Sequence, residues 1–400
     1  MANILMLPPE LLTYVLSFLH GTDLPSVSLV CKRFKEAVDV EWVWQKRCKQ
    51  EYGVDSLKGW KNPSYRTVYT KILHHYGFIF GIWQPEIGPY GGLVHISVVD
   101  GSILATQLLP PCDPNVTAPL RKKPLFSITL NDDDRTEVRC LKGPKGPHKC
   151  IITSASEETK DVFCAKCCKP DKHRHPGGRH EEFRSWLEEE LGNPNENLHD
   201  LIRELLLMKF MITNQYETVC HYKKIVLPVP MQDVPIQPGL FKGTYGSHGV
   251  EIVNVSYKDD KIHGTKVTGD PNVPACQLSI EADLNSPMVL TAEQQETLAI
   301  LEGLDMDDVI VRDQNAQQHL QPFKLPSGVS DRGLSQFQEG RSIQTCRARY
   351  FGTGLIASHG FMNSSRTLGH LVIFDDNFFG FLWLELRSLS VYSRVHDKFD

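Results

Sequence analysis

Leu7-Pro-Pro-Glu-Leu-Leu-Thr-Tyr-Val-Leu-Ser-Phe-Leu19 decides how the N-terminal part of this chain folds. Pro8 and Pro9 favour a helix start, because their fixed φ suits the first turn and their missing N–H is not needed there. Apolar side chains then follow at i, i+3, i+4 and i+7, which is one face of a helix, at Leu12, Val15, Leu16 and Leu19.

Two further short helices are predicted before Tyr52. Gly21 suits the end of the first helix, and Thr22 or Asp23 with Ser26 are candidate caps for the second. The third would carry Val30, Phe34 and Val38, with Trp44 just beyond it. Three short helices cannot hide all the leucines of this stretch, so part of its surface is expected to meet another protein. A helical cap packed on its own chain is the alternative.

The whole pattern resembles an F-box: Leu-Pro-x-Glu-Leu-Leu, Asp-Leu-Pro, Leu-Val-Cys-Lys-Arg-Phe and a following Trp. Resemblance to the F-box family implies binding to the S-phase kinase-associated adaptor (the Skp adaptor below), which links F-box proteins to a cullin–RING ubiquitin ligase. It also implies that the chain selects substrates for ubiquitination and proteasomal degradation and does no chemistry itself. The leucine-rich surface expected to bind the adaptor comprises Leu7, Pro8, Leu11, Leu12, Leu16 and Leu24.

Composition is that of a soluble protein of two or three domains, since 400 residues at roughly 150 per domain give that range. The net charge of −5 argues mildly against nucleic acid as the main ligand. No apolar run approaches membrane-helix length, and the N-terminus lacks the basic region of a signal peptide. We therefore expect a cytoplasmic and nuclear protein with neither nucleic-acid nor membrane partners. Its eleven cysteines then indicate reduced thiols or a metal site.

Beyond the F-box, assigned to residues 1–52, a linker helix is predicted within residues 53–76. From residue 77 to 400 short β-rich runs alternate with Gly-rich corners, which is typical of an antiparallel sandwich or barrel. The predicted fold class is therefore α+β: a three-helix F-box followed by one mainly antiparallel, β-barrel-like substrate domain. Within that domain we expect a helical hairpin at residues 179–213 and a polar loop at 281–340, with a short helix at Ala292–Leu301.

Residues 139–178 are poor in large apolar side chains and rich in Cys and His, so we expect a metal to order them. Mixed thiolate and imidazole ligands suit tetrahedral Zn²⁺. The residues alone allow several sets of four, drawn from Cys140, His148, Cys150, Cys164, Cys167, Cys168, His173 and His175.

Further stretches resemble one subfamily of F-box proteins: Gly81–Leu93, Gly239–Gly249, Thr268–Asn272, Phe351–Phe361 and Phe381–Leu386. The resemblance departs at Glu281–Gly340, where that subfamily carries a longer insert. It implies one structural Zn²⁺ held by Cys140, His148, Cys167 and His173, with Cys164 replacing Cys167 if the loop register slips. It also implies that substrates are recognised by their C-terminal ends, such as D-type cyclin tails or amidated chain ends.

A pocket for a chain end needs hydrogen-bonding groups close to the main chain, and glycine-rich turns provide them. Two similar segments, Phe241–Gly249 and Phe351–Phe361, are predicted to supply such turns. Asp270 is expected to accept from an amide N–H₂ and to repel a carboxylate; capping of its own turn is the alternative. The predicted pocket comprises Thr244, Tyr245, Ser247, His248, Asp270, Phe351, Thr353, Ser358 and Phe361.

Two other function classes compete with a substrate receptor. A zinc hydrolase would need an open coordination position and a nearby base, and no His-Glu-x-x-His helix or Gly-x-Ser-x-Gly elbow is present. A zinc-dependent nucleic-acid or protein interaction module without a ligase role would use the basic side chains around the Cys/His segment. Such a basic surface is more often only solvated.

Overall fold

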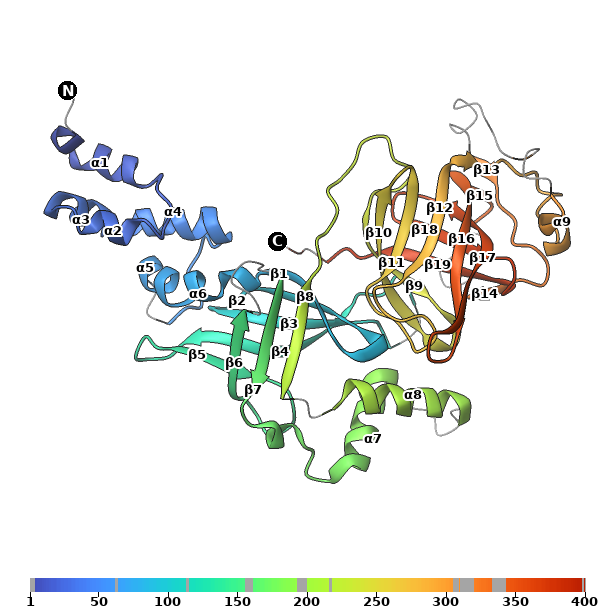
Figure 1. The fold of residues 1–400 in the computed structure, drawn as a ribbon, viewed down its shortest axis with the longest axis horizontal. Helices are drawn as coiled ribbons and strands as arrows, with labels where there is room; N and C mark the ends of the chain where they lie inside the picture. Colours follow the sequence, from blue (N-terminus) through green and yellow to red (C-terminus); the bar gives the residue numbers. More distant parts are fainter. Residues whose placement is uncertain are drawn as a thin grey trace.

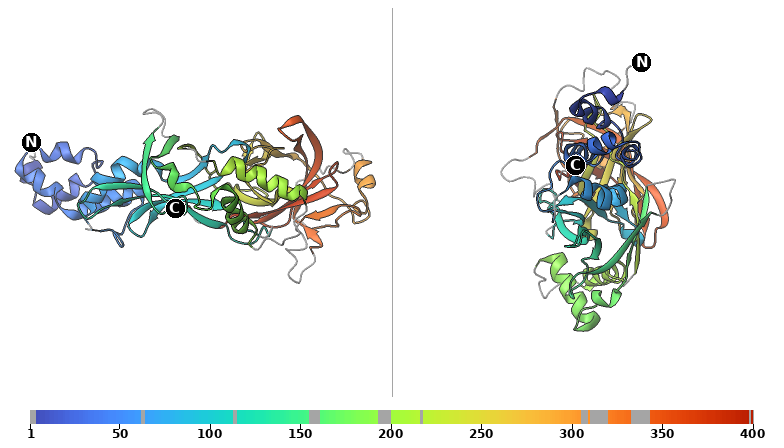
Figure 2. Two further views of the ribbon diagram at one scale, coloured as in Figure 1. Left: turned by 90° about the horizontal axis from the view of Figure 1, so that it is seen from below. Right: turned by 90° about the vertical axis from the view of Figure 1, so that its left-hand side faces the viewer.

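The computed structural model describes residues 4–61, 64–112, 115–154, 161–192, 200–215, 218–304, 309, 320–332, 343–397 and 399. Helices at the N-terminal end lead into two β-barrels, and a helical hairpin lies beside both of them (Figure 1). The molecule is elongated, with the N-terminal helices at one end and the second barrel at the other (Figure 2). No helix among the described residues has the length and apolar character needed to cross a membrane.

The F-box region has four α-helices after a short 3₁₀ turn, η1 (Ile4–Met6): α1 (Pro9–Leu16), α2 (Leu24–Ser28), α3 (Lys32–Val38) and α4 (Glu41–Tyr52). Helix α1 begins at Pro9 as predicted, but it ends at Leu16 and not near Gly21. The three-helix prediction is wrong, because Trp44 lies inside α4 and not beyond the last helix. Val40 is extended, so the chain turns there, and the Trp44 indole N–H donates to the Val38 carbonyl at 2.9 Å.

The predicted linker helix is continuous from Tyr65 to Tyr76, as α5 (Tyr65–Val68), the π-helical η2 (Tyr69–Leu73) and α6 (His74–Tyr76), followed by η3 (Gly77–Ile79). Ser64 caps it, since its side chain accepts from Thr67 N. Glu51 of α4 fixes the linker to the F-box, accepting from Gly21 N at 2.8 Å and from Tyr69 Oη at 2.5 Å. One continuous apolar core runs from the F-box through η2 into the first barrel.

The first barrel is closed and entirely antiparallel, with its strands in sequence order and β1 paired to β8. Its strands are β1 (Gly81–Pro85), β2 (Leu93–Val99), β3 (Ser102–Leu109), β4 (Arg121–Leu130), β5 (Thr136–Cys140), β6 (His148–Ser154), β7 (Val162–Cys167) and β8 (Val219–Lys224). The 3₁₀ turn η4 (Gly88–Tyr90) lies between β1 and β2.

The Cys/His segment is not coreless, contrary to the sequence-based expectation. It supplies β5, β6 and β7, and Ile152, Phe163 and Ala165 are buried in the barrel core. Alternate residues of a strand face one side, so a few apolar residues at every second position suffice to line the interior.

The predicted hairpin consists of α7 (Gly178–Leu191) and α8 (Asp200–Thr213), preceded by η5 (Pro170–His173). Phe183 and Trp186 of α7 pack on Phe210 of α8, with ring centroids 5.1 and 5.5 Å apart. Leu198, within the predicted hairpin, and the side chains of Leu201 and Ile202 lie outside the described residues.

A second antiparallel ring of strands follows, so the region expected to form one barrel contains two. Its strands are β9 (Gly239–Thr244), β10 (Val250–Lys258), β11 (Lys261–Lys266), β12 (Leu278–Pro287), β16 (Ala348–Ser358), β17 (Met362–Ile373), β18 (Phe378–Trp383) and β19 (Ser388–Arg394), with η6 (Gly246–His248) between β9 and β10. Pairing of β19 with β9 joins the two ends of this run. Sequence periodicity predicts strands but not which strands pair across long separations.

Residues 281–340 are not simply a loop. Strand β12 extends to Pro287, and the predicted helix is shorter, as α9 (Leu298–Glu302), which Thr297 caps. The short strands β13 (Gln321–Pro322), β14 (Ser330–Arg332) and β15 (Thr345–Cys346) follow. Leu298, Leu301 and Phe323 are buried against the outer face of the second barrel. Residues 305–308, 310–319 and 333–340 of the predicted loop lie outside the described residues.

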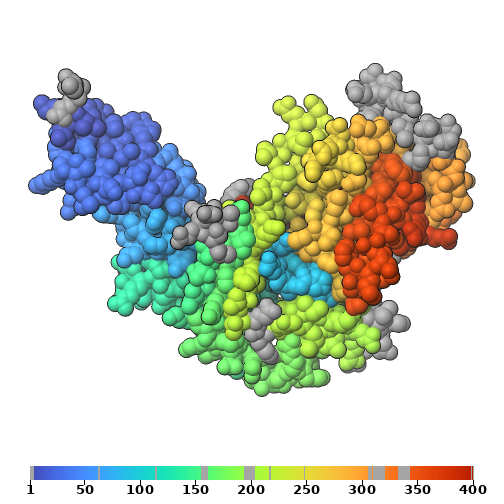
Figure 3. Space-filling view, viewed as in Figure 1, coloured from blue at the N-terminus to red at the C-terminus, as the bar shows by residue number. Residues whose placement is uncertain are grey.

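The two barrels meet where η4 of the first packs on the Thr268–Ala275 turn of the second (Figure 3, where residues near 90 lie between the two lobes). Gly269 N donates to the Tyr90 carbonyl at 3.0 Å, and Ala275 N donates to the Pro89 carbonyl at 2.8 Å. Gly91 is required here, since its φ is +57° and a Cβ would approach Ala275 Cβ to 2.6 Å.

Candidate functional site

Two cysteines and two histidines converge at the end of the first barrel: Cys140, His148, Cys167 and His173. Their ligand atoms all lie within 4.8 Å of one another. His148 Nε2 is 3.0 Å from His173 Nε2 and 3.1 Å from Cys167 Sγ, and Cys140 Sγ is 3.3 Å from His173 Nε2. Metal–ligand bonds of about 2.0–2.3 Å place tetrahedral ligand atoms roughly 3.3–3.8 Å apart, so this set fits Zn²⁺.

Strand pairing brings these ligands together from distant positions. Cys140 of β5 is directly opposite His148 of β6, and Cys150 of β6 is opposite Cys167 of β7. Gly143 lets the β5–β6 loop reach the fourth ligand, because its φ is +87° and a Cβ would lie 2.5 Å from His173 Cα. His148 Nδ1 lies 3.1 Å from the Gly146 carbonyl, which orients Nε2 toward the cluster.

The register of β7 selects Cys167 over Cys164. Phe163, Ala165 and Cys167 alternate into the buried side of the strand, whereas Cys164 faces the other way. Cys168 is exposed. Burial and the neighbouring His148 and Lys142 lower the pKa of His173 to about 4, so its imidazole is neutral at physiological pH, the form that binds metals.

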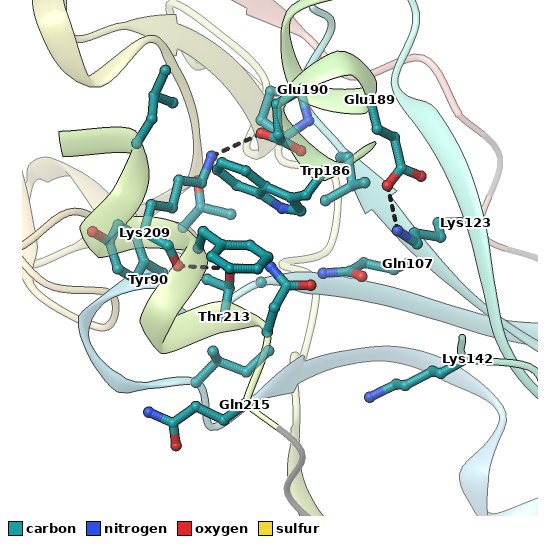
Figure 4. A pocket seen from close by; sticks show the side chains of 18 of the residues that line it. Tyr90, Gln107, Lys123, Lys142, Trp186, Glu189, Glu190, Lys209, Thr213 and Gln215 are labelled. Carbon is teal, nitrogen blue, oxygen red and sulfur yellow. Dashed lines mark hydrogen bonds and ion pairs between the residues drawn. The ribbon is translucent and has the colours of Figure 1, made fainter. Parts of the chain in front are cut away.

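A cavity of about 740 Å³ lies beside this cluster, where the two barrels and the helical hairpin meet. The first barrel contributes Tyr90, Gln107 and Lys123, and the loop after Cys140 contributes Lys142. Trp186 points into the cavity from α7, between the ion pairs Glu190–Lys209 and Glu189–Lys123 (Figure 4). The second barrel closes the other side with His248, Glu251 and Asp270.

Ion pairs hold the hairpin in place against the first barrel. Glu190 of α7 lies 3.0 Å from Lys209 of α8 and 3.1 Å from Arg121 of β4. Burial opposes ionisation of Glu190, but Lys209 and Arg121 outweigh it and lower the pKa of this carboxyl. Glu189 pairs with Lys123 of β4 at 2.6 Å, which fixes the same end of α7.

Three buried charged groups form the second barrel's part of the wall. Lys266 Nζ lies 2.7 Å from Glu251 Oε2 and 2.8 Å from Asp270 Oδ2. Asp270 Oδ1 also accepts from Asn272 N at 2.6 Å and from Val273 N at 3.0 Å. Burial opposes ionisation of Asp270, but Lys266 outweighs it and lowers its pKa to about 2. Burial raises the pKa of Glu251 to about 8; Lys266 opposes this and the facing Asp270 adds to it.

The structure brings together only part of the predicted substrate pocket. His248 and Asp270 line the cavity, and Asp270 also caps its own turn. Thr244 is buried in β9 and accepts from Val391 N, and the Tyr245 hydroxyl faces Ser279. The side chain of Ser247 lies outside the described residues.

The prediction that Phe351–Phe361 forms a glycine-rich turn is wrong, since residues up to Ser358 belong to strand β16. Phe351 packs on the outer core of the barrel, and Thr353 accepts from Arg366. Only the tip approaches the Asp270 turn, where Phe361 N donates to the Pro271 carbonyl at 3.0 Å. Positions 352 and 354 need glycine because a neighbouring strand and Trp383 pack directly against them. A sequence pattern does not distinguish glycines needed for close packing from glycines needed for a turn.

Sequence reasoning missed most of the residues that line the cavity, including Glu251, Lys123 and Trp186. Glu251 carries the only available signal, since an acidic residue interrupts the apolar run Val250–Val255 of a buried strand.

The F-box surface differs from the predicted set. Leu12, Leu16 and Leu24 are at most 5% exposed and form the F-box's own core. Pro8 and Leu11 are exposed and Leu7 is half-buried. Helix α1 is apolar on both faces, because Leu11 and Val15 form a second stripe, which Phe18 continues just beyond the helix. Large apolar side chains exposed in this region are Ile4, Met6, Leu11, Tyr14, Val15, Phe18, Leu29, Val30, Val40 and Trp42.

Comparison with known proteins agrees with this architecture. Residues 4–50 match the family model described as F-box-like, and residues 222–398 match the one described as cyclin D1 binding domain. The second match begins in β8 and covers the second barrel. Neither description is that of an enzyme family.

Full-length relatives cover nearly the whole chain. F-box only protein 31 of Rattus norvegicus is 42% identical over 99% of this chain and 85% of its own length. The Homo sapiens protein of the same name is 42% identical over 99% of this chain and 84% of its own length. F-box only protein 31-B of Xenopus laevis is 40% identical over 99% of this chain and 84% of its own length. With an F-box-like region and the second barrel matched as well, the chain belongs to the F-box only protein 31 family.

Proposed function

We propose that this protein is a substrate-recognition subunit of a Skp–cullin–F-box ubiquitin ligase that binds the C-terminal ends of its substrates in the cavity between the two barrels. Such substrates include D-type cyclin tails or amidated chain ends, which the ligase ubiquitinates for degradation. The observation that carries the proposal is the cavity itself: about 740 Å³, walled by three separate parts of the chain, and of a size that suits a few terminal residues.

The exposed apolar side chains of the F-box support the proposal that this region binds the Skp adaptor. Leu7, Pro8 and Leu11 of the predicted set belong to this surface, while Leu12, Leu16 and Leu24 support it from within. Burying apolar area gives about 25 cal/mol per Å², so a contiguous patch of this kind favours a stable interface.

The linker favours a fixed geometry between adaptor and substrate. Residues Val68, Tyr69, Ile72 and Leu73 are almost fully buried, in a core shared by the F-box and the first barrel. The middle of this helical segment bonds to both neighbours: Tyr69 Oη donates to Glu51 of the F-box, and Thr136 Oγ1 of the first barrel donates to the Lys71 carbonyl at 2.8 Å. A receptor of this form holds its substrate at a constant distance from the ligase.

We propose that Cys140, His148, Cys167 and His173 bind one structural Zn²⁺. Two thiolates and two imidazoles close the coordination sphere, so the metal would order the chain and not catalyse. The loop after Cys140 carries Lys142 and Gly143, and both line the cavity, as does His173. Metal binding would therefore fix one wall of the substrate site.

The cavity suits a chain end without a charge. Asp270 is ionised and 4% exposed, and a substrate carboxylate placed beside it would be repelled, whereas a terminal amide would not. Lys266 already pairs with two carboxyls and leaves little charge to attract a third. This favours amidated ends over acid ends.

The test uses pairs of peptides that differ only in a terminal amide or acid, with wild type and Asp270→Asn. We expect wild type to prefer the amide and the variant to lose that preference. A photoreactive group at the penultimate residue should cross-link to both α7 and the Thr268–Pro271 turn. Identical affinities in all four combinations, or cross-links confined to residues 108–121, would contradict the proposal.

A further inference from the structure

Most charged side chains that line the cavity are already paired with a group of opposite charge. The pairs are Lys123 with Glu189, Lys209 with Glu190, Arg179 with Glu182, and both Glu251 and Asp270 with Lys266. Lys142 is an exception. It lines the same cavity, and among the residues that the structure describes no carboxylate lies within ion-pair distance of its ammonium group. A cation without such a partner in a cavity can bind an acidic group of a ligand.

The backbone that carries Lys142 is fixed on both sides. Leu141 N donates to the Leu125 carbonyl at 2.9 Å, which continues the pairing of β5 with β4. Gly143 packs so closely on His173 that a Cβ would lie 2.5 Å from the Cα atom of this histidine. The proposed metal cluster leaves the charge of Lys142 uncompensated, because one Zn²⁺ and two thiolates are neutral in sum. Lys142 is therefore a positioned cation, whose backbone loses little freedom when a ligand binds.

Lys142 and Asp270 lie in different parts of the cavity. Asp270 belongs to the second barrel and is almost fully buried. Lys142 belongs to the loop after β5, where the next two residues, Gly143 and Pro144, line the cavity and are exposed. Figure 4 shows the side chain of Lys142 reaching into the cavity, apart from the ion pairs drawn there. A peptide that ends beside Asp270 and continues toward this exposed rim would pass Lys142.

The part of the chain around Lys142 is strongly basic. Residues Arg139–His180 contain ten Lys and Arg residues against four Asp and Glu, whereas the whole chain has a net charge of −5. Lys145 follows Lys142 in the same loop and Lys172 precedes the ligand His173, and both lysines are exposed. Charges of one sign around a cleft attract ligands of the opposite sign and orient them. This end of the cavity therefore favours an acidic segment.

We propose that Lys142 binds the side chain of an aspartate or glutamate that lies a few residues before the C-terminal end of the substrate. This inference rests on the proposed function, since it concerns the same cavity. It names the class of substrate: chain ends with an acidic side chain at a fixed spacing from the last residue. The second barrel would contact the terminal group through the Asp270 turn, and the first barrel would contact the acidic side chain through Lys142.

The experiment uses amidated peptides in which a single aspartate is moved through the positions that precede the last residue, with full-length protein. Wild type should bind the peptide with aspartate at one position, or at two adjacent positions, about tenfold more tightly than the all-alanine peptide, since a hydrogen bond between charged groups is worth about 1.4 kcal/mol or more. Equal affinity for every position would overturn the inference, because it would show attraction by the general positive charge and not by one positioned side chain.

Variants of Lys142 supply the decisive comparison. Lys142→Gln should lose the preference for aspartate while it keeps the affinity for the all-alanine peptide and the unfolding temperature and metal content of wild type. Lys142→Glu should prefer lysine at the position where wild type prefers aspartate. Lys145→Gln is the matched control, because it removes a charge from the same loop at a residue that does not line the cavity. This control should keep the preference within about twofold.

Two outcomes would contradict the role of Lys142. Folded Lys142→Gln that retains the position-dependent preference would overturn the inference alone. A change in the choice between amide and acid ends, with the aspartate preference intact, would show that Lys142 contacts the terminal group and not a side chain. Failure of wild type to bind any of the peptides, in contrast, would overturn the proposed function itself.

Discussion

The backbone N–H of Gly269 donates to the carbonyl of Tyr90 at 3.0 Å, and this bond joins the two barrels at the rim of the cavity. Residue 269 must be glycine, because a Cβ there would lie 2.3 Å from Ala275 N and 2.8 Å from the Pro89 carbonyl oxygen. The cavity therefore depends on contact between two backbones that are far apart in sequence.

We predict that Gly269→Ala separates the barrels locally. The added methyl meets backbone atoms that cannot rotate away, so the free energy of unfolding should fall by about 1–3 kcal/mol. Peptide binding should weaken while Skp adaptor binding is unchanged. Chemical unfolding and co-purification measure these effects. Gly303→Ala, at a position with ordinary φ and 3.2 Å of clearance, is the control. Unaltered peptide affinity and stability in Gly269→Ala would show that this contact does not shape the cavity.

We predict that the purified protein holds about one zinc per chain. Cys140→Ser should lose the metal and lower the unfolding temperature, because the cluster would lack one of its four ligands. Metal analysis by mass spectrometry checks both. Cys164→Ser and Cys168→Ser should keep the metal, since Cys164 faces away from the cluster and Cys168 is exposed. Absence of zinc from protein purified without chelator would contradict the prediction, and its loss from Cys164→Ser would indicate a different ligand set.

We predict that the double variant Leu7→Ala with Pro8→Ala abolishes co-purification with the Skp adaptor. Both residues lie just before α1, where Pro8 is exposed and Leu7 is only partly buried against the F-box core, so the barrels and peptide binding should be unaffected. Leu12→Ala offers a contrast. Its side chain is 1% exposed, so we expect a loss of about 2–5 kcal/mol of F-box stability in place of a loss of contact area. Unchanged adaptor binding by the folded double variant would refute the assignment of this surface.

We predict a pH dependence of stability that comes from Glu251. The pKa of its carboxyl is about 8 in the folded protein against a usual value of 4.5, so the folded state keeps a proton that the unfolded chain releases. Its contribution to stability is therefore fully present below pH 4.5 and is lost as pH rises toward 8. Measured by chemical unfolding, the stability of wild type should fall relative to Glu251→Gln between pH 5 and 8. Parallel pH profiles for the two proteins would exclude a raised pKa for Glu251.

The sequence alone determined the local features of this protein. Period and turn residues placed the start of α1, the linker helix and the hairpin. These depend on neighbours within a few residues, which is why a sequence pattern reveals them. The F-box resemblance was likewise carried by short motifs, whereas the Cys and His residues alone left several sets of four metal ligands open.

Tertiary structure decided what depends on pairing and register. A one-residue shift in β7 would put Lys166 or Cys168 in the place of Cys167 opposite Cys150, and only the barrel's strand register excludes it. The segment Phe351–Phe361 was predicted as a turn because glycine occurs both in turns and where strands pack closely. Trp383 packs against Gly354, so this glycine serves close packing. The cavity joins η4, α7 and the Asp270 turn, and Glu251 meets its partner Lys266 only through pairing of β10 with β11. Contacts of this kind form only when distant segments pack together, so no local pattern encodes them.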